Sequence, residues 1–241
     1  MNTDATVEQM KQLRLEGMVH AYQAQLEQPI HQQLETHELI AHLIETEKLF
    51  RQQQKTDYYL KLAKLRLPAI PEQVICSASR NLSKQQLAVL LEGSYLTEAE
   101  NLLITGATGS GKSYLACALG YQSCLLGNKT AYFNMNRFIE KISLAKLDGS
   151  YLKVLNYLER QTLIILDDFG LQPLTQDIKL ALLQILEERY GKKSTIITSQ
   201  LPVSAWHPYI NEPTIADAIC DRLTAKAHRI ELKGESLRRK K

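Results

Sequence analysis

The feature that most constrains the fold of this chain is a glycine-rich loop at residues 106–113, which reads Gly-Ala-Thr-Gly-Ser-Gly-Lys-Ser. An apolar run at 102–104 precedes the loop, and a run of helical character at 114–119 follows it. In such a strand–loop–helix setting, glycines let backbone N–H groups surround a polyphosphate at the N-terminus of the helix. The sequence therefore predicts a binding site for a nucleoside triphosphate.

Two side chains of this loop have specific expected roles. We expect Lys112 to pair with the β- and γ-phosphates, and the hydroxyl of Ser113 to ligate Mg²⁺. The predicted nucleotide-binding residues are Gly106, Ala107, Thr108, Gly109, Ser110, Gly111, Lys112, Ser113 and Tyr114.

Two acidic residues, Asp167 and Asp168, follow an apolar run at 163–166. A buried strand that ends in Asp is the second half of a triphosphate hydrolase site, in which Asp167 would complete the Mg²⁺ shell together with Ser113. Asp168 would then orient the attacking water. A further run, 194–200, changes from apolar to polar at its end. Either the last side chains of this run point toward the γ-phosphate, or the run is only a polar strand end that precedes a loop.

Composition excludes several classes of protein. The chain has 241 residues, of which 44% are hydrophobic and 23% charged, as in a soluble globular protein of one or two domains. No apolar run approaches the roughly 20 residues of a membrane span. The four cysteines form no CxxC pair, so we expect buried thiols and a cytoplasmic location. A net charge of +3 is too small to indicate nucleic-acid binding by itself.

The pattern of apolar residues divides the chain into a helical part, 1–70, and an α/β part, 71–241. The first part has helical periodicity, Pro29 splits it into at least two helices, and 66–76 is the expected linker. A helix at 81–92 follows. Beyond it, strands and helices alternate, which predicts a doubly wound α/β fold with a parallel sheet. The predicted strands are 101–105, 130–134, 162–166, 194–199 and 229–232, and the predicted helices are 112–126, 136–146, 175–190 and 213–226.

Four motifs in this order resemble an AAA+ ATPase: the loop at 106–113, the acidic strand at 163–168, the polar strand end at 198–200, and Asp221-Arg222-Leu223. Within that class, the chain is similar to the IstB-type transposition helper ATPases of insertion sequences, which are related to the DnaC-type helicase loaders. Further stretches carry this resemblance, namely 13–18, 163–171, 187–190, 194–204, 217–223 and 228–236.

The resemblance implies an AAA+ P-loop fold with a helical N-terminal domain and a reduced C-terminal lid, which binds ATP with Mg²⁺. Arg222 matches an arginine finger that acts on the neighbouring subunit, Gln200 matches a sensor position, and Arg238 lies where a second arginine sensor could sit. Ser199, beside Gln200, is the alternative match to the sensor position, where Asn is commoner in relatives. Many AAA+ proteins have Glu at the place of Asp168, and Asp is one methylene shorter, so slow hydrolysis is expected. The implied catalytic residues are Lys112, Asp167, Asp168, Gln200 and Arg222.

The resemblance also implies partners: an ATP-dependent homo-oligomer that assembles on duplex DNA and presents it to a transposase, whose activity it stimulates. Binding that does not depend on DNA sequence uses Lys and Arg contacts to phosphates. If 45–66 is one helix, a basic face is formed by Lys48, Arg51, Lys55 and Arg66. A merely solvated basic face is the alternative. The tail, 238–241, is a second basic cluster.

Two other functions remain open at this point. A replicative helicase loader would have the same core but a helicase as its partner. A binding module could use ATP only as an assembly switch, with negligible turnover.

Overall fold

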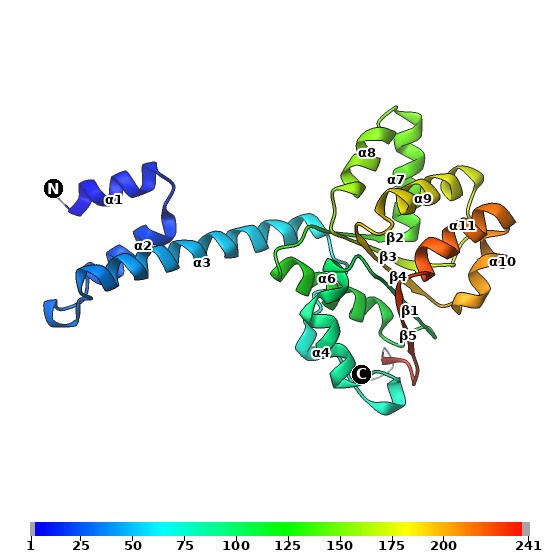
Figure 1. Ribbon diagram of the computed structural model, residues 1–241, viewed down its shortest axis with the longest axis horizontal. Coiled ribbons are helices and arrows are strands. Elements are labelled where there is room, and N and C mark those ends of the chain that lie inside the picture. Colours follow the sequence, from blue (N-terminus) through cyan, green and yellow to red (C-terminus); the bar gives the residue numbers. More distant parts are fainter. Residues whose placement is uncertain (1–2, 238–241) are drawn as a thin grey trace. The chain divides into compact units, whose positions relative to one another are not determined.

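The computed structural model describes residues 3–237, and the chain forms two compact units, Met1–Tyr58 and Tyr59–Lys241 (Figure 1). The boundary between them falls inside helix α3 (Thr36–Ala63). The predicted division into 1–70 and 71–241 stays a prediction, because compactness alone does not define functional domains. The basic tail at 238–241, with Arg238, lies outside the described residues.

The first unit consists of helices. It contains α1 (Thr3–Gln12), α2 (Glu16–Leu26), the 3₁₀ turn η1 (Ile30–Gln32) and most of α3. The predicted break at Pro29 is confirmed, since Pro29 lies between α2 and α3. Gly17 of α2 packs directly on α3, where a Cβ atom would lie 2.7 Å from the Cα of Glu47. The absence of a side chain at Gly17 therefore allows the two helices to approach this closely.

The predicted helix over 45–66 is wrong at its C-terminal end. Helix α3 stops at Ala63, and Lys64 adopts a left-handed conformation with φ 52°, which an α-helix does not continue through. Lys48, Arg51 and Lys55 lie on α3, but Arg66 does not. The expected basic face of four residues is thus reduced to three.

The second unit begins with a connecting segment. The expected linker, 66–76, contains only one short 3₁₀ turn, η2 (Pro71–Gln73), and another, η3 (Ala78–Arg80), follows. This segment lies inside the second compact unit, so its role as a linker stays a prediction. Helix α4 (Lys84–Glu92) then starts three residues later than predicted. Ser83 caps it in a reciprocal capping box with Gln86, which satisfies two N–H groups at the helix start. The short α5 (Ser94–Thr97) precedes the sheet.

The centre of this unit is a five-stranded parallel sheet with the strand order β2-β3-β4-β1-β5. The strands are β1 (Asn101–Gly106), β2 (Thr130–Asn134), β3 (Leu163–Phe169), β4 (Ser194–Ser199) and β5 (Ala227–Leu232). Chain order and spatial order differ, as in a doubly wound sheet, and the predicted α/β class is confirmed. The predicted reduced lid would follow β5, where 233–237 are the last residues described.

Helices cover both faces of the sheet (Figure 1). Successive side chains of a strand point to opposite faces, so Leu102 and Ile104 join the apolar core with α4, α5 and α6, whereas Leu103 joins the core with the helices that follow β2. Helix α8 and the short α5 and α10 were not predicted. The helices after β1 are α6 (Lys112–Leu125), α7 (Met135–Leu147), α8 (Tyr151–Glu159), α9 (Gln176–Arg189), α10 (Trp206–Ile210) and α11 (Pro213–Thr224).

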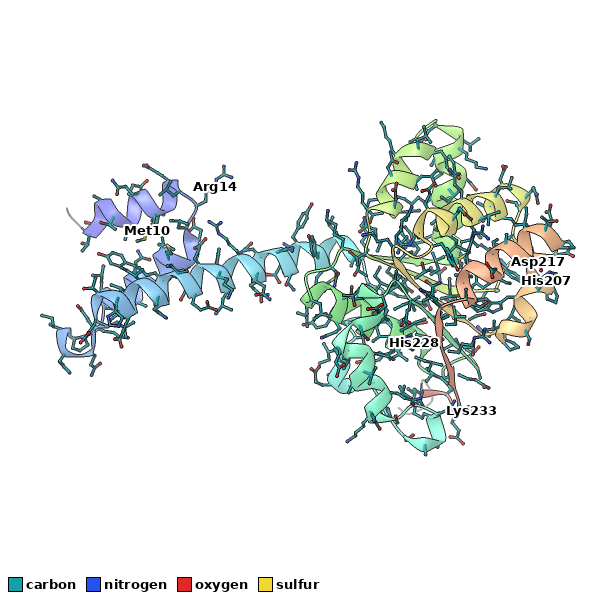
Figure 2. The ribbon with its side chains drawn as sticks, viewed as in Figure 1. Met10, Arg14, His207, Asp217, His228 and Lys233 are labelled. Carbon is teal, nitrogen blue, oxygen red and sulfur yellow. The ribbon has the colours of Figure 1, made fainter. Side chains whose placement is uncertain are left out.

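Polar contacts join some of these helices at the surface. His207 of α10 lies 3.1 Å from the carboxylate of Asp217 on α11 (Figure 2). The expected thiols are confirmed as free: Cys117 and Cys124 are buried, and Cys76 and Cys220 are half-buried. Within 3–237, no helix has the length and apolar character needed to cross a membrane.

Arg189, the last residue of α9, joins several elements through a buried guanidinium. Its Nη1 donates to the carbonyls of Leu158 at 2.9 Å and Gln161 at 2.7 Å, and its Nη2 donates to the carbonyl of Ser194. Its Nε reaches the Thr195 hydroxyl at 3.4 Å. Burial lowers the pKa of Arg189 to about 9, so the group stays charged at neutral pH. The planar fork of donors therefore ties α8, α9 and β4 together.

We expect Arg189→Lys to destabilise the fold. A lysine ammonium has three donors at one point and cannot reach carbonyls on three elements, so it would leave buried carbonyls unpaired. The expected loss is about 2–4 kcal/mol of unfolding free energy in urea denaturation. The control is Arg160→Lys, the same change at an exposed position, which should stay within about 0.5 kcal/mol of wild type. Equal losses in the two variants would contradict this role.

Candidate functional site

The predicted phosphate-binding loop connects the carboxyl end of β1 to the N-terminus of α6. Its glycines adopt conformations that other residues avoid: φ is 144° at Gly106 and 81° at Gly109. A Cβ atom at Gly106 would lie 2.2 Å from the carbonyl oxygen of Leu232, and one at Gly109 would lie 2.1 Å from Oγ of Ser236. The loop is therefore held between the sheet and the segment that follows β5.

Polar groups of the loop are arranged around its hollow. The ammonium of Lys112 donates to the carbonyls of Gly106 at 2.8 Å and Ala107 at 2.9 Å. The hydroxyl of Ser110 is buried and has no hydrogen-bond partner among the described residues. A buried hydroxyl normally has a partner, so this atom fits a ligand that accepts hydrogen bonds, such as a phosphate.

Asp167 lies at the end of β3 and is completely buried. Its carboxylate accepts hydrogen bonds from three hydroxyls: Ser113 at 2.9 Å, Tyr132 at 2.5 Å, and Thr198. The pKa of Tyr132 is raised by burial and by this hydrogen bond, so its phenol remains a donor at neutral pH. Ser113 and Asp167 thus bring two oxygen ligands together, which is the donor chemistry that Mg²⁺ prefers.

Asp168 adopts an unusual backbone conformation, with φ 65°, where the pairing of β3 with β4 shifts register. Its carboxylate accepts a hydrogen bond from the Asn134 amide at 2.7 Å and lies 3.3 Å from the guanidinium of Arg66. Its backbone N–H donates to Oγ1 of Thr198 at 3.0 Å. Such bulges redirect side chains, and this one places two adjacent carboxylates at one end of the sheet.

Gln200, the predicted sensor, follows β4 and contacts the loop. Oγ1 of Thr108 donates to Oε1 of Gln200 at 2.8 Å. A cavity of about 450 Å³ opens between these groups. Among its lining residues are Arg66, Thr108, Gly109, Gly111, Lys112, Ser113, Tyr114, Asp168 and Gln200.

Arg222 is the predicted catalytic residue that lies away from the phosphate-binding loop and the two carboxylates. Its Nε donates to the carboxylate of Glu187 on α9, and its Nη1 donates to the carbonyl of Ala218 at 3.0 Å. The backbone carbonyl of Arg222 accepts from Asn101, the first residue of β1, at 2.9 Å. The phosphate-binding loop follows the last residue of that strand, so a strand length of about 17 Å separates Arg222 from it.

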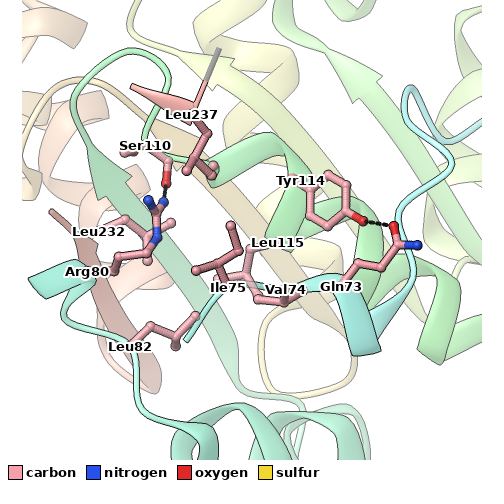
Figure 3. A pocket seen from close by; sticks show the side chains of 11 residues that line it. Gln73, Val74, Ile75, Arg80, Leu82, Ser110, Tyr114, Leu115, Leu232 and Leu237 are labelled. Atoms are coloured by element: carbon pink, nitrogen blue, oxygen red, sulfur yellow. Dashed lines mark hydrogen bonds between the residues drawn. The ribbon is translucent and has the colours of Figure 1, made fainter. Parts of the chain in front are cut away.

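A second, smaller cavity of about 230 Å³ adjoins the first and shares Gly111, Tyr114 and Leu237 with it (Figure 3). The phenol of Tyr114 donates to Oε1 of Gln73 at 2.9 Å, which places the linker beside α6. The apolar walls come from Val74, Ile75, Leu82, Leu115, Leu232 and Leu237. The cavity therefore combines mainly apolar walls with polar groups on two sides, Arg80 with Ser110 on one and Tyr114 with Gln73 on the other, as small-molecule sites do (Figure 3).

Several residues of the site were not predicted. Tyr132 and Asn134 belong to β2, and Asn134 is in register with Asp167. Because parallel strands end at one edge of the sheet, the polar end of β2 was a signal that could have indicated Asn134. Arg66 carried no such signal, since it is 102 positions away from Asp168.

With this geometry in place, the chain can be compared with known proteins. The model of the family described as IstB-like ATP binding protein matches residues 8–241. This chain belongs to that family. The protein is 43% identical to the insertion-sequence ATP-binding protein y4pL of Sinorhizobium fredii, over 97% of this chain and 96% of the relative. It is 37% identical to an ATP-binding protein of insertion sequence IS1162 from Pseudomonas fluorescens, over 85% of this chain and 89% of the relative.

Solved structures with a similar fold include the DnaC helicase loader and DnaA. The match to the DnaC helicase loader has a TM-score of 0.59 at 20% identity and covers 71% of this IstB-like chain and 100% of that chain. The match to AMPPCP-bound DnaA from Aquifex aeolicus has a TM-score of 0.60 at 18% identity, and it covers 71% of this chain and 52% of the DnaA chain. At these identities the likeness concerns the fold alone. The predicted AAA+ fold and the IstB resemblance are both confirmed.

We expect Thr198→Val to destabilise the protein by about 1–3 kcal/mol. Valine has nearly the same shape but removes the donor to Asp167 and the acceptor for the Asp168 N–H. Urea denaturation measures the change. The control is Thr175→Val, since Thr175 is exposed and its side chain makes no capping hydrogen bond. If Thr198→Val is as stable as the control variant, the hydroxyl does not hold the carboxylate pair.

Proposed function

We propose that this IstB-like protein is an ATP-dependent regulator that assembles on duplex DNA and recruits or stimulates a transposase in DNA transposition. The observation that carries the proposal is the position of the loop opposite Asp167 and Asp168, joined through the Ser113 hydroxyl. That arrangement suits Mg·ATP. The relatives, which are insertion-sequence ATP-binding proteins, supply the transposition context.

The chemistry proposed for the site is hydrolysis of ATP. Lys112 would exchange the carbonyls of Gly106 and Ala107 for phosphate oxygens, and Ser113 and Asp167 would hold Mg²⁺, which neutralises phosphate charge. Asp168 would orient the attacking water, with Asn134 holding its carboxylate in place. The side chain of Asp168 is one methylene shorter than that of Glu, which supports slow turnover.

The smaller cavity is the proposed site of the nucleobase. It adjoins the phosphate loop through Gly111 and Tyr114, as a ligand with connected base and phosphates requires. Ile75, on its wall, is 54% exposed, and a flat ring placed there would cover apolar surface.

Arg222 is proposed to act in trans. It lies at the edge of the sheet opposite its own phosphate loop, so it can reach a γ-phosphate only if that nucleotide belongs to a neighbouring copy. This supports a homo-oligomer with ATP at the interfaces between subunits.

The proposed DNA contacts of the first unit are Lys48, Arg51 and Lys55. Lys48 is 3.4 Å from Glu45, and Arg51 is 2.6 Å from Glu47, so DNA phosphates would have to compete with two carboxylates on the same helix. Such contacts affect affinity more than sequence preference. We therefore expect the binding to depend strongly on salt.

Assembly is the central test. Mass photometry of the full-length protein, with duplex DNA and a non-hydrolysable ATP analogue, should show oligomers that are absent without nucleotide. A monomer under all conditions, with unchanged DNA affinity, would contradict the proposal. A pull-down that retains a replicative helicase instead of a transposase would favour the helicase-loader alternative.

Asp168→Asn tests turnover. Asn tolerates positive φ at least as well as Asp, so the fold should be kept while the charge that orients water is lost. We expect hydrolysis to fall by about 10²–10⁴-fold with ATP binding retained, measured by phosphate release in the presence of DNA. The control is Asp177→Asn, at an exposed position on α9. Equal, near-zero rates for wild type and Asp168→Asn would favour the assembly-switch alternative.

Arg222→Ala tests the action in trans. Hydrolysis should fall, while binding of a fluorescent ATP analogue by the monomer should persist, because the residue is remote from its own loop. Mixing this variant with Lys112→Ala should restore part of the activity, since each subunit then supplies what the other lacks. A rate for Arg222→Ala equal to that of wild type would remove this role.

A further inference from the structure

Arg66 lies beside the two carboxylates of the site. Its Nη1 is 3.3 Å from Oδ2 of Asp168 and 3.6 Å from Oδ2 of Asp167. The side chain is 46% exposed and lines the same cavity as Lys112 and Ser113. The guanidinium therefore lies against both carboxylates, in the cavity that also contains the proposed phosphate position.

The charges around this pair show what the guanidinium contributes. The hydroxyl and amide donors to the two carboxylates, from Ser113, Tyr132, Thr198 and Asn134, are neutral groups. Two adjacent carboxylates repel each other, and a buried one is costly without a nearby cation. Arg66 lies within 4 Å of both and supplies that positive charge.

The backbone at Arg66 is anchored, whereas the side chain is long. Leu65 and Leu67 pack against the apolar core under α6. A Cβ atom at Gly120 of α6 would lie only 2.9 Å from the side chain of Leu65. The guanidinium can therefore leave the carboxylates by rotation of its own side chain, without movement of the segment that carries it.

We propose that Arg66 competes with Mg²⁺ for Asp167 and Asp168, and so acts as a positioning residue that holds the carboxylate pair ready until a metal–nucleotide complex enters. The inference rests on the proposed nucleotide site. Arg66 lies 3.6 Å from the Asp167 carboxylate, and a guanidinium and a divalent cation on the same carboxylate repel each other. A metal that binds Asp167 must therefore displace Arg66. The need for this displacement weakens binding of the metal without nucleotide. Mg²⁺ that arrives with ATP is also held by the phosphates, which offsets the cost.

Mn²⁺ binding to the nucleotide-free, full-length protein tests the competition, because free and bound Mn²⁺ differ in electron paramagnetic resonance. We expect Arg66→Gln to bind Mn²⁺ at least threefold more tightly than wild type. Arg66→Lys keeps the charge but not the planar fork, and should give a smaller increase. The control is Lys64→Gln, which removes an equal charge two residues away at an exposed position and should leave the affinity unchanged.

The Mg²⁺ dependence of thermal unfolding supplies a readout that a purely structural role would not change. In EDTA, Arg66→Gln should melt below wild type, because the buried Asp167 and its neighbour Asp168 have lost their cation. Millimolar Mg²⁺ should restore its melting temperature and have less effect on wild type. A loss of stability that Mg²⁺ does not restore would overturn the proposal. If Arg66→Gln does not fold, Arg66→Lys must show the same Mg²⁺-dependent recovery.

The same proteins separate this inference from the proposed function. If wild type binds no fluorescent ADP in the presence of Mg²⁺, the proposed nucleotide site fails. If wild type binds nucleotide but Arg66→Gln binds Mn²⁺ no more tightly, only the competition is overturned. If Arg66→Gln, relative to wild type, loses more affinity for ATP than for ADP while its Mn²⁺ affinity is unchanged, Arg66 is a phosphate ligand instead.

Discussion

Burial of the Asp167 carboxylate at the end of β3 is the constraint on which the rest of the site depends. A buried charge is tolerated only when hydrogen bonds and a nearby cation compensate for lost water. Here the hydroxyl donors come from Ser113 on α6, Tyr132 on β2 and Thr198 on β4. These elements meet because parallel strands end at one edge of the sheet, where α6 also begins. The arrangement that satisfies Asp167 therefore also brings the phosphate loop to the carboxylates.

The two edges of the sheet have different roles. The carboxyl edge holds the larger cavity, which is lined by Lys112 and Asp168 and is the proposed phosphate site. The opposite edge holds Arg222, tied to Glu187, and the buried Arg189 that joins α8, α9 and β4. An arginine placed there is remote from its own phosphate loop but lies at the surface, where another copy could offer a nucleotide. One sheet can thus separate the residues proposed to bind ATP from the residue proposed to act on a neighbour's ATP.

The sequence predicted the sheet well because β1, β3 and β4 are short, mainly apolar runs that are buried on both faces. Strand β5 is mostly exposed, and its prediction began two residues too late. The predicted bounds of β2 and β4 agree with the structure, and β3 extends three residues further than predicted because Asp167, Asp168 and Phe169 continue it. Helix α8 was not predicted, since its nine residues offer a short periodic pattern. Helix α3 was extended too far, because its end depends on one left-handed residue, Lys64, for which the sequence has no glycine.

The sequence by itself determined the phosphate loop, the acidic strand end and the alternation of strands and helices, because each is a local pattern whose chemistry follows from neighbouring residues. Only the tertiary structure decided which distant side chains surround Asp167 and Asp168. Tyr132, Asn134 and Arg66 are 35, 34 and 102 positions from the carboxylates that they contact. Ion pairs and hydrogen bonds over such separations leave no periodicity in the sequence. The chain brings them together only when the sheet has formed and the linker has packed against α6.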